Sequence, residues 1–131
     1  DIPGRARVRQ LAQVVACDIH PIDNLKVLNF LTGELGVSAE GRLTWYRHWV
    51  CQGLEGLEGL VANHAETGLF CHGDQPSIAD LCLVPQLYNA RRFDVDLSRY
   101  PTLQRIYQAC QALDAFAAAA PEKQPDAATN V

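Results

Sequence analysis

The most informative part of the sequence is residues 73–86, Gly73-Asp74-Gln75-Pro76-Ser77-Ile78-Ala79-Asp80-Leu81-Cys82-Leu83-Val84-Pro85-Gln86. Ser77 and Asp80 have the spacing of a capping box, in which the serine hydroxyl and the carboxylate each accept a hydrogen bond from the other residue's backbone N–H. The positions that follow are apolar on most sides, which is typical of a buried central helix. We therefore predict a helix from Ser77 to about Arg92, with Pro85 inside it as a residue that bends or unwinds the helix.

On both sides of this block, apolar residues recur three or four positions apart, which is the helical period. This pattern predicts a first helix from about Pro3 to Thr32 and a second from about Ala39 to Asn63. Pro21 lies inside the first helix and should bend it there. Pro101 opens a last helix that ends before Pro121. Since no segment shows a strand pattern, we predict an all-α bundle.

The composition is that of one ordinary globular domain. The chain has 131 residues, of which 48% are hydrophobic and 20% charged, and its net charge is −4. A net negative charge argues against a nucleic-acid partner. No apolar run approaches the roughly 18 residues that a membrane-spanning helix needs. Five cysteines without a C-x-x-C pair favour a reducing cytoplasm over a disulfide framework.

Extended by Asn89-Ala90-Arg91-Arg92-Phe93, the capped block resembles the helical domain of zeta-class glutathione transferases, the maleylacetoacetate and maleylpyruvate isomerases. Residues 17–25, 93–101 and 120–126 resemble the family's first long helix, a loop and the tail, so the resemblance covers almost the whole chain. It implies a C-terminal-like helical bundle over residues 1–120 and an irregular tail over residues 121–131. The family's N-terminal thioredoxin-like domain, which activates glutathione, has no counterpart among these residues. We therefore expect this chain alone to be inactive.

The resemblance also gives a role to the residues around the predicted bend. His20 and Asn24 are four positions apart and lie on one face of the predicted helix. Their residue types alone predict half-exposed polar side chains that form hydrogen bonds with neighbouring residues. The family positions that contact the cofactor glutathione correspond to His20, Asn24, Leu25 and Lys26. Maleylpyruvate-type members can place an arginine where this chain has Leu25, which favours maleylacetoacetate as the substrate.

Arg91 and Arg92 end the central helix, where the helix dipole favours cations. A guanidinium can also grip a carboxylate through two parallel hydrogen bonds. In the family the arginine immediately before phenylalanine recurs, so the resemblance implies that Arg92 is the catalytic residue that orients the substrate and stabilises enolate charge. The implied reaction on this cis-enoyl diketo acid is addition of the glutathione thiolate to the cis double bond, rotation about the new single bond and loss of the thiolate.

Several alternatives remain open at this stage. Dehalogenation of small α-haloacids is a related activity, and a free-standing helical interaction or assembly module without catalysis fits the same residues. As an enzyme, we expect the protein to be a homodimer. We expect no metal site, because the groups around Cys17 and Cys71 lack the paired spacing of zinc motifs. The repeated glycines 53, 56 and 59 reflect either close helix packing or drift by duplication.

Overall fold

The computed structural model describes residues 1–127, and within that range the chain contains helices and turns but no strand. The α-helices are α1 (Ile2–Gln13), α2 (His20–Asp23), α3 (Leu25–Gly33), α4 (Ala39–Val61), α5 (Ile78–Arg92), α6 (Pro101–Gln111) and α7 (Asp114–Ala118). A π-helical segment, η1 (Val14–Ile19), joins α1 to α2, and short 3₁₀ turns lie at η2 (Leu97–Arg99) and η3 (Pro121–Lys123). The predicted all-α class is confirmed.

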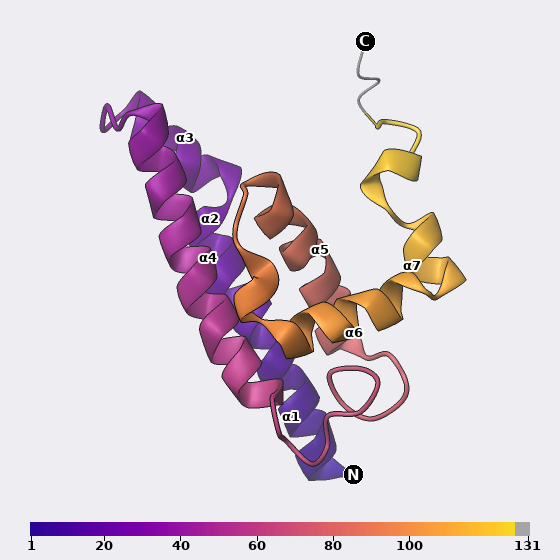
Figure 1. Ribbon diagram of the computed structural model, residues 1–131. Helices are drawn as coiled ribbons and strands as arrows, with labels where there is room; N and C mark the ends of the chain where they lie inside the picture. Colours follow the sequence, from indigo (N-terminus) through magenta and orange to yellow (C-terminus); the bar gives the residue numbers. More distant parts are fainter. Residues whose placement is uncertain (128–131) are drawn as a thin grey trace.

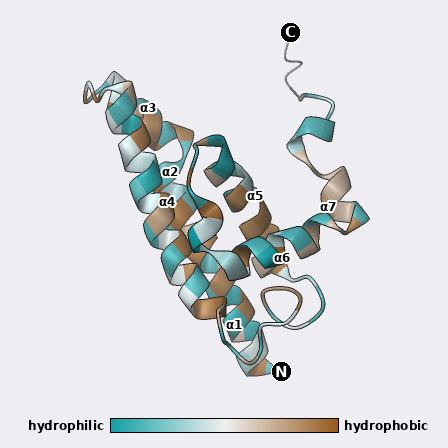
Figure 2. Cartoon of the chain, viewed as in Figure 1, coloured by the Kyte–Doolittle hydropathy of each residue, from teal (hydrophilic) through white to brown (hydrophobic). Residues whose placement is uncertain are grey.

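The α1–η1–α2–α3 run and α4 lie side by side and antiparallel, and α5 lies against them at the centre (Figure 1). α6 crosses under α5, and α7 with η3 forms an arm that leads away from the body (Figure 1). Hydrophobic positions, brown in Figure 2, occur on the helices where α1, α4, α5 and α6 meet. The core residues that are at most 2% exposed include Leu11, Val50, Leu54, Leu83 and Ile106.

The first predicted helix is interrupted, and the break does not occur at Pro21. The chain remains helical through Pro21. The helix ends at Asp23, because the backbone of the next residue, Asn24, is extended with ψ 163°. The π-helical turns come directly before Pro21, and the N–H of His20 bonds the carbonyl of Val15, five residues back. This wider turn accommodates a proline that has no N–H to donate and a ring that crowds the preceding turn.

The central helix begins as predicted, and its capping box is formed. Asp80 is fully buried, and its Oδ2 accepts from the N–H of Ser77 at 2.8 Å. Its Oδ1 accepts from the N–H of Cys71 at 2.9 Å, a bond to the preceding loop that the local sequence pattern does not indicate. Asp80 therefore fixes both the helix start and the loop that leads into it.

α5 is continuous through Pro85, so of the two effects predicted for this proline, bending or unwinding, unwinding does not occur. The last predicted helix is instead two helices, because Leu113 is extended (φ −89°, ψ 130°) and separates α6 from α7. The second helix is close to its prediction, capped by Ser38 and ending at Val61 rather than Asn63.

The three repeated glycines of α4 have different surroundings. A Cβ on Gly53 would lie 2.2 Å from Cγ1 of Ile19, whereas nothing lies within 4 Å of a Cβ on Gly56 or Gly59. Gly53 therefore permits close approach between α4 and η1. The other two glycines have no such role within the part of the chain that the structure describes.

Candidate functional site

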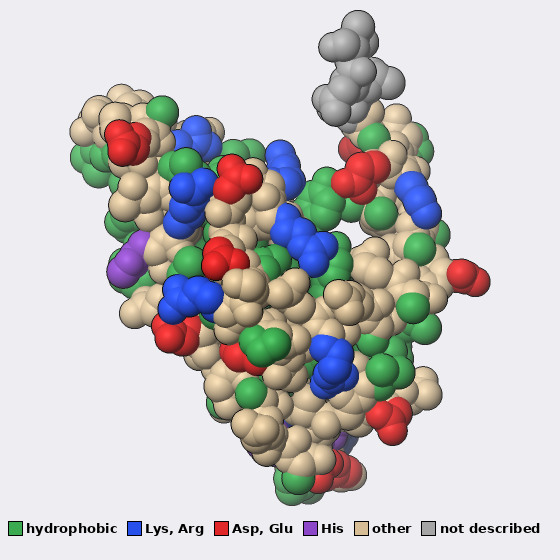
Figure 3. Space-filling model, viewed as in Figure 1, with side chains coloured by type: hydrophobic (Ala, Val, Ile, Leu, Met, Phe, Trp, Pro, Cys, Tyr) green, Lys and Arg blue, Asp and Glu red, His purple; other side chains and the backbone are tan. Residues whose placement is uncertain are grey.

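Arg92 is the last residue of α5 and is exposed. It lies at one end of a groove of about 450 Å³ between α5, the α6 side chain Tyr107 and the α7–η3 arm. Figure 3 shows an opening between the helical body and this arm. Within residues 1–127, no hydrogen bond or ion pair joins the Arg92 guanidinium to another residue. Its donors are therefore available to an anion.

Arg91 is placed differently, although it is the adjacent residue. Its guanidinium carbon lies 4.2 Å from the centre of the Tyr107 ring, which is the geometry of a cation–π contact. Such a contact stabilises the packing of α5 on α6. Of the two arginines that end the helix, Arg91 thus has a structural partner and Arg92 faces the groove.

The floor of the groove is largely apolar, and its rim is polar. Leu81, Val84 and Pro85 of α5 line it together with Phe116 of α7. On the rim, the hydroxyl of Tyr88 donates to Oε1 of Glu122 at 2.6 Å. This hydrogen bond raises the pKa of Tyr88 and lowers the pKa of Glu122. The contact holds the η3 turn over α5, so the arm forms one wall of the groove.

The four residues predicted to contact glutathione lie where α2 gives way to α3. His20, Leu25 and Lys26 are exposed, Leu25 at 67%. Asn24 is the N-cap of α3, where its Oδ1 accepts from the N–H of Lys26 at 3.0 Å and its Nδ2 donates to the Pro21 carbonyl at 3.0 Å. Since the helix ends at Asp23, Asn24 does not share a continuous helix face with His20. Their contact with glutathione remains a prediction.

Two aromatic residues of α4 connect this segment to the end of α5. The indole N–H of Trp45 donates to the carbonyl of Ile22 at 3.0 Å, and the ring of Tyr46 stacks on Phe93 with centroids 3.9 Å apart. The pKa of Tyr46 is raised to about 12, mainly by burial and also by the charge of Asp23, while the charge of Arg92 acts to lower it. Tyr46 therefore lies within electrostatic reach of both segments, and the tertiary structure brings them to the same end of the bundle.

Asp23 is a residue that sequence reasoning missed. It is 7% exposed, and neither carboxylate oxygen has a hydrogen-bond partner within residues 1–127. Burial raises the pKa of Asp23 to about 7. No sequence signal indicates this residue, because the predicted helix continues past Asp23 and the helix end at this position appears only in the structure.

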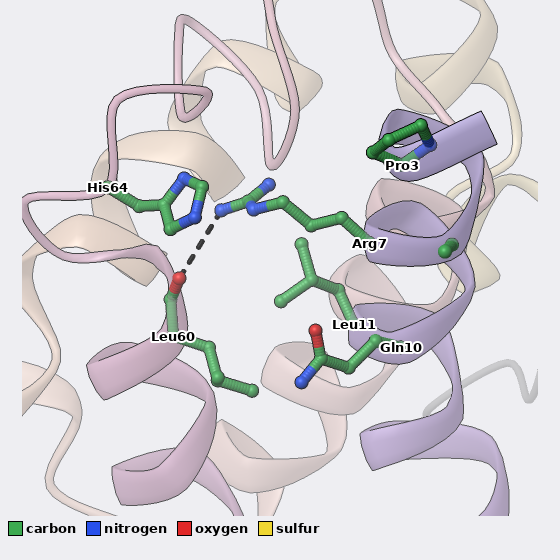
Figure 4. A pocket seen from close by; sticks show the side chains of 7 residues that line it. Pro3, Arg7, Gln10, Leu11, Leu60 and His64 are labelled. Atoms are coloured by element: carbon green, nitrogen blue, oxygen red, sulfur yellow. Dashed lines mark hydrogen bonds between the residues drawn. The ribbon is translucent and has the colours of Figure 1, made fainter. Parts of the chain in front are cut away.

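Other features lie away from this end of the molecule. A hollow of about 590 Å³ between α1 and the end of α4 contains Arg7, which donates to the carbonyls of Leu60 at 3.3 Å and Cys71 at 2.7 Å (Figure 4). Because its guanidinium already binds this loop, Arg7 acts as a structural tie. Within residues 1–127, no group of three or more His, Cys, Asp or Glu side chains could hold a metal ion, and no helix has the length and apolar character to cross a membrane.

Comparisons with known proteins agree with this architecture. Residues 44–109 match the family model described as glutathione S-transferase, C-terminal domain. The chain is 54% identical over 123 residues to a probable maleylacetoacetate isomerase of Vibrio cholerae, covering 94% of this chain and 56% of that protein. It is 44% identical to a maleylpyruvate isomerase of Ralstonia, covering 98% of this chain and 60% of that protein. The chain therefore spans little more than half the length of these relatives.

Solved structures show the same similarity. The holo structure of maleylpyruvate isomerase, a bacterial zeta-class glutathione S-transferase, superposes with a TM-score of 0.95 at 44% identity, covering 98% of this chain and 60% of that one. The structure of a maleylacetoacetate isomerase from Methylobacterium extorquens AM1, with bound malonate and glutathione, has a TM-score of 0.94 at 43% identity. This match covers 98% of the present chain and 60% of the Methylobacterium chain.

Proposed function

Because this chain belongs to the family of glutathione S-transferase C-terminal domains, we propose that it is the helical domain of a glutathione-dependent cis–trans isomerase of the zeta class. The proposed substrate is maleylacetoacetate or maleylpyruvate, both cis-enoyl diketo acids. Relatives with both of these names match almost the full length of this chain.

The observation that carries this proposal is the guanidinium of Arg92, which has no partner within residues 1–127 and lies at the end of a groove with an apolar floor. The groove accepts the carbon chain of the substrate, and the guanidinium grips a carboxylate through two parallel hydrogen bonds. Charge that develops on the adjacent enolate is stabilised by the same cation. A related isomerase binds the dicarboxylate malonate together with glutathione, in keeping with a site for acidic substrates.

Glutathione is the cofactor in this proposal, and it supplies the thiolate that adds reversibly to the cis double bond. His20, Leu25 and Lys26 form an open surface rather than a closed cavity, so this chain provides one wall of the glutathione site. Asn24 holds that wall in shape by capping α3. Five free cysteines fit the reducing cytoplasm in which such a thiol cofactor is kept.

We further propose that a thioredoxin-like domain completes the enzyme. Ile78 and Leu81 of α5 are 54% and 59% exposed, and this apolar face continues into the groove, which Leu81 and Pro85 also line. An apolar stripe of this kind on a central helix is typical of a surface that another domain covers. The full-length protein would be a homodimer, which sedimentation at micromolar concentration tests.

Substitution of the paired arginines in the full-length enzyme tests the assignment of Arg92. We expect Arg92→Lys to lower kcat/KM for the diketo acid by about 1.5–3 kcal/mol, because lysine reproduces the planar fork poorly. Arg91→Lys is the matched control and should change kcat/KM little. Equal kcat/KM values for the two variants would contradict the assignment and leave Arg92 with only a stabilising role as a cation at the end of a helix.

Titration of glutathione into this chain alone tests the need for a second domain. With one exposed wall, we expect millimolar binding or none, which is about −4 kcal/mol at best. Micromolar binding, or isomerase turnover by the isolated chain, would contradict the proposed division of the site. An isolated chain that instead captured an unrelated protein would favour the interaction-module alternative.

A further inference from the structure

The turn that follows Arg92 has an unusual residue at its critical position. The N–H of Val95 bonds the carbonyl of Ala90 at 3.0 Å, and the N–H of Asp94 bonds the carbonyl of Arg91 at 3.1 Å, the two bonds of a Schellman motif. Asp94 is the left-handed residue of this motif, with φ +54°. Glycine usually takes that position, because an L side chain is strained there. The end of α5 therefore requires support from elsewhere in the fold.

Arg47, in the first half of α4, provides that support. Its Nε donates to the carbonyl of Phe93 at 2.8 Å, and its guanidinium lies 3.6 Å from Oδ2 of Asp94. Phe93 is the C-cap of α5, and its carbonyl is one of the groups that a helix end leaves without an internal donor. The Asp94 side chain is 87% exposed, so the ion pair contributes little, and the part-buried bond to the carbonyl carries most of the effect.

The neighbouring residue of α4 holds the same turn from a second side. Tyr46 is 4% exposed, and its ring stacks on Phe93 at an interplanar angle of 27°. Tyr46 and Arg47 thus fix both the ring and the carbonyl of Phe93. Arg92 directly precedes Phe93, and its guanidinium has no hydrogen-bond or ion-pair partner within residues 1–127, so the contacts of Tyr46 and Arg47 with Phe93 hold the helix end that carries it. Without such contacts, the last turn of a helix frays.

We infer that Arg47 is a positioning residue for Arg92, acting through the Phe93–Asp94 turn. The inference rests on the proposed function, in which Arg92 binds the carboxylate of the substrate. A shift of about 1 Å in such a group is enough to reduce the rate greatly, because binding and catalysis both depend on its placement. Arg47 itself contacts the turn and does not face the groove that Arg92 lines.

A double-mutant cycle in the full-length enzyme tests this role. We expect Arg47→Ala to raise KM for the diketo acid about tenfold, which is about 1.4 kcal/mol, while KM for glutathione changes less than about twofold. Arg47→Lys should recover most of the loss, because its ammonium group can still donate to the Phe93 carbonyl. Arg42→Ala, on the same helix, is the matched control, because the Arg42 side chain makes no hydrogen bond or ion pair within residues 1–127.

The decisive comparison is made in an Arg92→Ala background. If Arg47 acts through Arg92, Arg47→Ala should change KM there by less than about twofold. An equal loss in both backgrounds, or no loss in the wild-type background, would overturn the inference while leaving the role of Arg92 intact. A fully active Arg92→Ala variant would instead overturn the proposed function, and the inference with it. Asp94→Gly removes the ion pair and the strain together, so it should preserve KM if the carbonyl bond is the main contact.

Discussion

Replacing the repeated glycines of α4 with alanine should change the free energy of unfolding in opposite directions, with a loss at Gly53 and a gain at Gly56 and Gly59. A methyl group on Gly53 would lie 2.2 Å from Cγ1 and 2.6 Å from Cδ1 of Ile19, which is itself only 2% exposed. A methyl group on Gly56 or Gly59 would meet nothing within 4 Å. The same substitution thus adds a clash at one site and only removes backbone freedom at the other two.

The size of the effect follows from two terms. Alanine is favoured over glycine in a helix interior by about 0.5–1 kcal/mol, so Gly56→Ala and Gly59→Ala should each raise the free energy of unfolding by that amount. Gly53→Ala gains the same helical term but overpacks a closed contact, which costs about 1–3 kcal/mol. The helical term cancels in the comparison, so Gly53→Ala should be less stable than Gly56→Ala by about 1–3 kcal/mol.

Urea unfolding of this chain, followed by circular dichroism, measures the three free energies. The control repeats Gly53→Ala in an Ile19→Ala background, in which the clashing atoms are removed and only the Ile19 Cβ remains, 3.5 Å away. There the cost of Gly53→Ala should vanish or reverse. A Gly53→Ala variant at least as stable as Gly56→Ala would refute the close approach of α4 to η1.

Two other predictions concern buried carboxylates. Asp23→Asn should stabilise the chain by about 2–4 kcal/mol at pH 8, because burial raises the pKa of Asp23 to about 7. Between about pH 4 and pH 7 the folded state then holds more protons than the unfolded state, so the wild type loses stability as the pH rises and the difference from Asp23→Asn disappears near pH 4. Unfolding curves at pH 4, 6 and 8 measure this, with the exposed Asp18→Asn as control, and parallel pH profiles would contradict it. Asp80→Ala should cost about 2–4 kcal/mol and Ser77→Ala only about 1 kcal/mol, because the Asp80 carboxylate accepts from two backbone N–H groups. Equal unfolding midpoints for these two variants would show that Asp80 does not hold the loop.

The start of the central helix is an example of what local sequence predicts well. A capping box depends on residues three positions apart, and its hydrogen bonds form within one turn. The start of α5 and the presence of the box were therefore correctly predicted from Ser77 and Asp80. The further bond from the N–H of Cys71 to Asp80 crosses nine residues of loop, and no local pattern indicates it.

The first helix was predicted only in part. The sequence does not indicate a helix end at Asn24, but it predicts a distortion near Pro21, because a proline removes a backbone hydrogen bond. The π-helical turns before it accommodate the proline, and the break falls at Asn24, whose side chain caps α3. The place of the distortion and the place of the helix end both depend on competing hydrogen bonds of similar strength. Packing against α4, through the hydrogen bond from Trp45 to the carbonyl of Ile22, favours the end at Asn24.

The sequence alone was enough to predict the helical class, the cap of the central helix and the place of two arginines at its end. Each of these depends on periodicity or on neighbours within one or two turns. Only the tertiary structure shows that Arg91 lies on Tyr107 while Arg92 faces a groove, that Asp23 is buried without a hydrogen-bond partner among the described residues 1–127, and that Arg47 reaches a turn 46 residues away. These contacts join segments that are distant in the chain. They are set by how side chains fill the space between helices, and a pattern read along one helix carries no information about that space.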